Sequence, residues 1–127
     1  MSTPFSVQGV LSLPVGPGAT ADSIPFGLAS QFDSRASFEY MLPASPGNRS
    51  VDFGTMPAAG AKLLLVTYEA VDDTPPPPVS LLVNGGAPIE LSAGGFLCAG
   101  SPSPSSGITA LDISYTDVGK VKVWLLG

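Results

Sequence analysis

The sequence has no histidine and only one cysteine, Cys98. The absence of histidine removes the commonest general base, the Ser-His and Cys-His nucleophile pairs and most zinc sites. A single cysteine excludes a disulfide within the chain. The apolar surroundings of Cys98, GGFLCAG, predict a small buried side chain whose thiol pKa is raised. We therefore expect no catalytic, cofactor-binding or metal-binding residues.

Charged residues are also scarce. They make up 12% of the chain, with five basic and ten acidic residues and a net charge of −5, whereas soluble domains average about 25%. The basic residues are too few and too scattered for counterion-release binding to DNA or RNA. Two explanations of the low charge stay open: part of the surface is covered by another chain, or the surface is rich in Ser, Thr, Pro and Gly.

Long apolar runs are absent. No stretch approaches the roughly 20 apolar residues of a membrane-spanning helix. The N-terminus, MSTPFSVQGV, lacks the basic segment and apolar core of a secretory signal. We expect a chain made in a cytoplasm, with no membrane contact.

The usual catalytic and nucleotide-binding motifs are missing as well. No G-x-S-x-G, G-x-G-x-x-G or G-x-x-x-x-G-K-[ST] pattern occurs. Asp33 with Glu39, or Asp52 with Glu69, are imaginable glycosidase pairs, and Asp72-Asp73 is a weak calcium signal. Solvated strand faces and turns account for all of them. The sequence predicts a protein that is not an enzyme and has no small-molecule substrate.

The residues that are abundant indicate an all-β fold. Fifteen glycines and fourteen prolines in 127 residues disfavour long helices and favour short strands joined by tight turns. An apolar content of 44% suffices for one folded domain. The pattern is typical of an antiparallel β-sandwich or jelly roll of about eight strands.

The clearest strand pattern lies at the C-terminus. Apolar and polar residues alternate over 111–116 and again over 120–125, and Asp117-Val118-Gly119 between them is a turn sequence. We therefore predict a hairpin, with Lys120 and Lys122 on its polar face, opposite Asp112 or Asp117.

Other segments predict the remaining strands. Asn84-Gly85 between apolar runs predicts a primed turn, with Gly86 as a bulge and with Leu82 or Val83 paired to Ile89 and Leu91. The other expected strands are Arg35–Leu42, Arg49–Gly54 and one within Gly94–Gly100. Ala61–Ala70 predicts a central strand covered on both faces, and a helix is the competing interpretation of that segment.

The first 34 residues predict an arm attached to a sandwich core of residues 35–127. Phe5–Leu13 alternates like a strand, either of the sandwich or added to a neighbour's sheet. In Pro14–Ser34, three prolines and three glycines predict a long loop without a regular element. Its apolar residues, among them Phe26 and Phe32, should dock on the chain's own sandwich or on a neighbouring subunit.

Trp124 has the opposite parity to Val121, Val123 and Leu125. It fits a two-sided core strand, an aromatic interface anchor or a ligand platform. With Phe26 and Phe32 it completes the set of predicted contact residues.

The second half of the chain, residues 51–127, resembles small structural proteins of tailed bacteriophages. The resemblance lies in the NGG turn, the PIELSAGGF segment, the strand that begins GIT and the Leu-Leu-Gly ending. It implies a virion component made in the host bacterial cytoplasm, either a capsid decoration (cement) protein or a tail, baseplate or fibre-associated module. It further implies a symmetric homo-oligomer whose partners are the major capsid protein or other virion subunits. The alternative of another class is a carbohydrate- or receptor-binding β-sandwich, with Trp124, Tyr40, Tyr68 and Tyr115 as the available platform.

Overall fold

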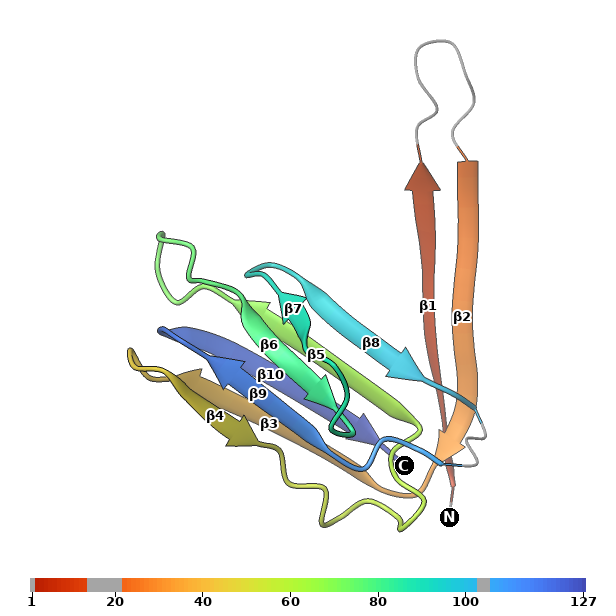
Figure 1. The fold of residues 1–127 in the computed structure, drawn as a ribbon. Coiled ribbons are helices and arrows are strands. Elements are labelled where there is room, and N and C mark those ends of the chain that lie inside the picture. The colour runs from red at the N-terminus through yellow and green to blue at the C-terminus, as the bar shows by residue number, and fades with distance from the viewer. Residues whose placement is uncertain (1, 14–21, 103–105) are drawn as a thin grey trace.

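The computed structural model describes residues 2–13, 22–102 and 106–127. Within these ranges the chain is all-β, with ten strands and antiparallel pairing throughout (Figure 1). None of the described residues forms a helix capable of crossing a membrane. The predicted all-β class is therefore confirmed.

Eight of the strands form two four-stranded sheets. The first sheet has the order β3 (Arg35–Leu42), β10 (Gly119–Leu126), β5 (Leu63–Glu69), β8 (Phe96–Gly100). The second has the order β4 (Gly47–Ser50), β9 (Leu111–Tyr115), β6 (Val79–Val83), β7 (Ile89–Leu91). In Figure 1 the sheets lie one in front of the other in a sandwich-like arrangement.

The space between the sheets holds the core. Period-two alternation directs every second side chain of β10 inward, and Val121, Val123 and Leu125 are fully buried. Tyr68 and Leu81 bury their side chains from the facing sheets. The predicted central strand is confirmed as β5, which lies between β10 and β8. The predicted cover on both of its faces is wrong, because Leu65 on the outer face is only half-buried.

The predicted C-terminal hairpin is wrong. β9 pairs with β4 and β6, whereas β10 pairs with β3 and β5, so the turn at 116–118 carries the chain from one sheet to the other. A tight turn reverses the chain, but it does not determine whether the next strand pairs alongside or crosses the core. Lys120 and Lys122 consequently face Glu39 and Glu69, with N–O distances of 3.3 and 3.8 Å, rather than Asp112 or Asp117.

The predicted turn at Asn84-Gly85 is confirmed, with φ values of 52° and 69°. Its register differs from the prediction, because β7 pairs through Leu81 with Ile89 and through Val79 with Leu91. Leu82 and Val83 pair instead with β9 on the other side.

The N-terminal region is a second departure from the sequence prediction. β1 (Thr3–Leu13) and β2 (Asp22–Phe32) pair along their whole length as a separate two-stranded ribbon, the N-terminal hairpin. A strand thus occupies much of the segment predicted to be a loop; residues 14–21 lie outside the described residues. Pro25 is tolerated because both strands of a ribbon are edge strands, where proline need not break a ladder bond.

The hairpin is attached to the sandwich at one end (Figure 1). Lys62 Nζ donates a hydrogen bond to the Gln31 carbonyl at 2.7 Å, and Ser30 Oγ donates to the Pro102 carbonyl at 2.7 Å. Backbone hydrogen bonds also join Ser34 and Gly127 in both directions, at 2.8 and 2.9 Å. These contacts hold the base, and the hairpin extends away from it past β8.

Candidate protein-docking surface

The N-terminal hairpin is amphipathic. Residues paired across an antiparallel ribbon place their side chains on the same face. In the register Leu11↔Ile24, Gly9↔Phe26, Val7↔Leu28, one face collects most of the large apolar residues. The other face alternates small and polar residues with two prolines and Val10. The apolar face consists of Phe5, Val7, Leu11, Ile24, Phe26, Leu28 and Phe32.

The apolar face is covered only near its base. Leu28 lies against Gly100, where an added Cβ would be 2.8 Å from Leu28 Cδ2 and 3.1 Å from Leu63 Cδ1. Phe5 and Phe32 contact each other, with ring centroids 6.0 Å apart, and both are half-buried.

Farther from the base the same face is exposed. Leu11, Ile24 and Phe26, which we call the ridge, are 49%, 48% and 54% exposed. Burying such side chains is worth about 1.5–3 kcal/mol each, and an isolated two-stranded ribbon is at best marginally stable in water. The ridge therefore has the properties of a surface that a further body covers.

A second apolar area lies on the outer face of the first sheet. Cross-strand pairing aligns Trp124 with Leu65 and Leu65 with Cys98 in one row across β10, β5 and β8. Phe96, two residues before Cys98 and hence on the same side of β8, is 66% exposed. We call Leu65, Phe96, Cys98 and Trp124 the patch.

Charged residues border the patch along β10 and also on β3, where Arg35 lines a crevice with Trp124, and the hairpin borders the patch at its other end. Beyond Trp124 along β10 come Lys122 and Lys120, each in an ion pair with a glutamate on a neighbouring strand. In the opposite direction, the row of Leu126, Leu63 and Gly100 meets the hairpin through Leu28.

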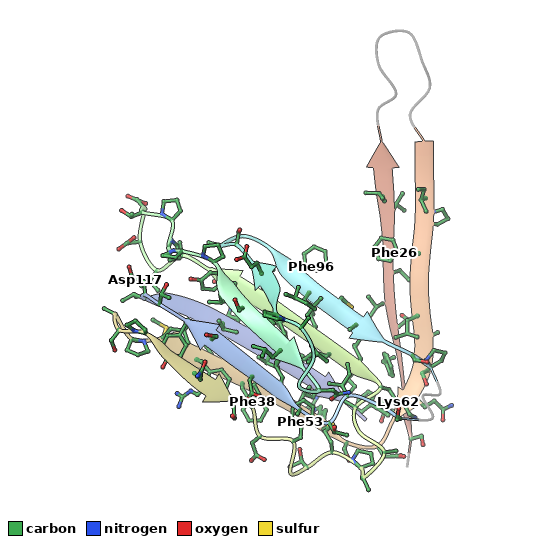
Figure 2. The ribbon with its side chains drawn as sticks, in the orientation of Figure 1. Phe26, Phe38, Phe53, Lys62, Phe96 and Asp117 are labelled. Carbon is green, nitrogen blue, oxygen red and sulfur yellow. The ribbon has the colours of Figure 1, made fainter. Side chains whose placement is uncertain are left out.

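The hairpin and the outer sheet face form the two walls of an apolar corner. Phe26 and Leu28 from the hairpin, with Leu63 and Cys98 from the sheet, line a crevice of about 190 Å³ at its apex. Figure 2 places Phe26 on the hairpin and Phe96 at the start of β8, on the two sides of this corner. The hairpin residues Thr3–Leu13 and Ser23–Phe32 contain no Asp, Glu, Lys or Arg, and Asp22 at the far end of β2 is the one charged residue of the two hairpin strands.

The three predicted contact residues, Phe26, Phe32 and Trp124, lie on or beside the corner, but they do not form one cluster. Phe26 belongs to the ridge and Trp124, 37% exposed, to the patch, so the core alternative for Trp124 is wrong. Phe32 lies at the hairpin base, where it lines a crevice of about 410 Å³ together with Trp124, Arg35 and Ser37.

The prediction for Cys98 was only half correct. Its side chain is exposed on the outer face, because β8 is an edge strand whose alternate residues point away from the core. Partial burial among apolar neighbours still raises the pKa of the Cys98 thiol. Sequence reasoning missed Phe96 and Leu65 as surface residues. In FLCAG, residues two apart lie on the same face of a strand, so this segment could have placed Phe96 and Cys98 on one face of β8.

Five of the six carboxylates considered for catalysis or calcium binding have hydrogen-bond or ion-pair partners. Asp33 accepts a hydrogen bond from Ser2 Oγ at 2.9 Å, and Asp52 and Asp72 accept bonds from backbone N–H groups two residues ahead. Across residues 2–13, 22–102 and 106–127 no three His, Cys, Asp or Glu side chains gather as metal ligands. The corner presents exposed apolar side chains beside the edge strand β8.

Comparison with protein-family models and with curated proteins finds no match to this chain.

Proposed function

We propose that this chain is a non-enzymatic structural protein of a tailed-bacteriophage virion, most simply a capsid decoration (cement) protein that bridges subunits of the shell. The observation that supports the proposal most strongly is the ridge. It is the part of the apolar hairpin face that extends beyond the sandwich and is left exposed. A ribbon of this kind suits a staple between subunits, because its apolar face and free strand edges find partners only on assembly.

The strand order supports the proposal. Counted from β3, one sheet has the order first, eighth, third, sixth and the other second, seventh, fourth, fifth. We propose on this basis that the two sheets form a jelly roll, an architecture used by viral capsid proteins and also by lectins. Because one fold serves many functions, it supports the proposal only together with the ridge and the resemblance to phage structural proteins.

The test is quantitative mass spectrometry of purified virions of the encoding phage. A decoration protein should be present in amounts comparable to the major shell protein, whereas a tail, baseplate or fibre component should be present in only a few copies. Virions made without the gene should rupture at a lower temperature and recover when purified protein is added. Absence of the chain from purified virions would refute the assignment.

A carbohydrate- or receptor-binding function is the second candidate, and one observation favours it. Trp124 is exposed beside Arg35, Ser37, Glu39 and Lys122, which line shallow crevices around its ring. Trp124 is the only tryptophan of the chain, so its fluorescence reports on this place alone. Saturable changes on adding oligosaccharides, lost in Trp124→Phe, would favour this candidate, and a flat titration would favour the assembly role.

A further inference from the structure

We infer that the patch is the docking site for the ridge of a second copy of this chain, so that two copies exchange hairpins in a reciprocal dimer. This inference rests on the proposed assembly role and names the partner of its docking surface.

The first reason is that the hairpin already binds this sheet within one chain. Leu28 of its apolar face lies against Gly100 and Leu63 on the outer face of the first sheet. The patch is the next row of the same sheet, and the ridge is the continuation of the same hairpin face. A second copy therefore offers a patch to the exposed ridge and a ridge to the exposed patch. Both contacts would be of the same type as the contact of Leu28 with Gly100 and Leu63 within one chain.

The second reason is symmetry. A two-fold interface requires one surface that is complementary to itself. The corner meets this requirement, because each copy carries one ridge and one patch on facing walls. When a two-fold rotation relates the two copies, the hairpin of each copy enters the corner of the other.

The third reason is charge. Neither the ridge nor the patch contains a charged residue, and the ion pairs of Lys120 and Lys122 lie to one side. The three ridge residues are uncharged, so their binding brings no charge onto the patch, which avoids a large desolvation penalty there.

The area buried in the interface determines how tightly the two copies are expected to bind. Strands rise about 3.4 Å per residue, so the distal half of the hairpin presents a face about 20 Å long and about 10 Å wide. Two ridges and two patches of that size bury roughly 800 Å² in total, which lies in the range of weak, transient interfaces. The dimer should therefore depend on protein concentration in solution and gain strength where many copies are held on one surface.

The test uses Cys98, the only cysteine and a member of the patch. The double variants Ile24→Cys/Cys98→Ser and Leu11→Cys/Cys98→Ser carry a thiol on the ridge and none on the patch. Each variant, enlarged by a tag, is mixed with the untagged natural chain under mild oxidation by oxidised glutathione. Two thiols then join as a disulfide while glutathione is reduced. A band with the mass of one tagged and one untagged chain reports contact between ridge and patch of different copies.

The matched controls are Ser23→Cys/Cys98→Ser and Ser12→Cys/Cys98→Ser. Ser12 and Ser23 are also a cross-strand pair, one residue away from Leu11 and Ile24 and on the opposite face of the hairpin. The inference predicts at least a tenfold higher yield of mixed dimer from the ridge cysteines than from the controls. Equal yields from both faces, or no mixed dimer from either, would overturn it.

A second measurement does not depend on thiol chemistry. In sedimentation equilibrium, Phe26→Ser should raise the dimer dissociation constant at least tenfold, because each dimer loses two aromatic anchors. Val10→Ser is the control: Val10 is 61% exposed but lies on the opposite face. Equal effects of the two substitutions would refute the inference.

The two proposals fail separately. If cross-linking fails while virions contain the chain, the exchange is wrong and the virion role stands. If ridge and patch cross-link but virions lack the chain, the exchange stands and the virion role is wrong.

Discussion

The ring of Phe26 lies directly over the backbone of Gly9, its cross-strand partner in the hairpin. A methyl group added to Gly9 would collide with the ring edge. Aromatic residues commonly cover a glycine opposite them in a ribbon, which compensates for the missing side chain. Because Gly9 has no side chain, the Phe26 ring can lie flat on the hairpin face. A larger residue at position 9 would push the ring away from that face.

Gly9→Ala should displace the Phe26 ring at little cost to the fold. The colliding atoms belong to the far end of a movable side chain, so the free energy of unfolding should change by less than about 0.5 kcal/mol. Self-association should weaken, as measured by sedimentation equilibrium. Gly27→Ala on the opposite face is the comparison and should leave association unchanged. A large loss of stability in Gly9→Ala would show that the glycine serves folding instead.

Asn84 should be the most sensitive turn residue. Its Oδ1 accepts hydrogen bonds from the backbone N–H groups of Thr109 and Ala110 at 2.8 and 3.1 Å, and its backbone has a positive φ of 52°. Asn84→Ala leaves two donors without their acceptor and puts alanine in a left-handed conformation, which should lower the free energy of unfolding by about 2–3 kcal/mol. Urea denaturation measures it. Asn84→Asp retains the acceptor and should lose clearly less; an equal loss would contradict this explanation.

Tyr68 should make stability fall at alkaline pH. Its side chain is 1% exposed, and its hydroxyl donates to the Pro77 carbonyl at 3.0 Å. Burial, reinforced by the negative charge of Asp117, raises the pKa of Tyr68. The native state therefore holds its proton more tightly than the unfolded state does. This contribution is complete below the unfolded pKa of about 10 and is lost as pH rises through the folded pKa.

Tyr68→Phe separates the two effects of the hydroxyl. At neutral pH the variant should lose about 1 kcal/mol with the hydrogen bond. Above pH 10 its stability should decline less steeply than that of the natural chain. Some slope should remain, because burial also raises the pKa of Tyr40. Chemical denaturation at several pH values from neutral to alkaline gives the comparison; identical slopes would mean that Tyr68 does not titrate in the transition.

Thr67→Val should stabilise the protein. The Thr67 hydroxyl is buried on the outer face of the first sheet and has no hydrogen-bond partner among the described residues. An unsatisfied buried hydroxyl costs about 1–3 kcal/mol, and valine fills nearly the same volume. Thermal melting should show the gain. Thr67→Ser, which keeps the hydroxyl and loses the methyl group, should instead lower the melting temperature.

Local patterns in the sequence predicted several single strands well, although the strand expected over Arg49–Gly54 is β4, which covers Gly47–Ser50. Arg35–Leu42 was predicted with the bounds that β3 has, because its alternation is set by one buried face. The positive φ at Asn84 and Gly85 also followed from residue type alone. Both features depend only on neighbours in the sequence.

Pairing depends on distant residues and was predicted less well. The turn before Gly119 could not show that β9 and β10 belong to different sheets, because both arrangements place the same side chains in the core. The prolines and glycines of the second hairpin strand favoured a loop. The spacing by two of Ile24, Phe26 and Leu28, as on one face of a strand, indicated the strand that the structure has. The patch was missed because its row exists only once β10, β5 and β8 are side by side.

The sandwich should fold without the hairpin. β1 and β2 pair only with each other among the described strands, and no residue of either belongs to the buried core. A chain beginning at Arg35 loses the hydrogen bonds at the hairpin base and the cover that Leu28 gives to Gly100. We expect it to keep the far-ultraviolet circular dichroism of a β protein and a cooperative melt, at a temperature a few degrees lower.

Light scattering after size exclusion then separates folding from assembly. The full chain should show a mass that rises with concentration, whereas the shortened chain should stay at one copy throughout. A shortened chain that unfolds would mean that the hairpin is part of the folding unit. A shortened chain that still associates as strongly as the full one would place the assembly surface on the sandwich alone and remove the hairpin from the proposed mechanism.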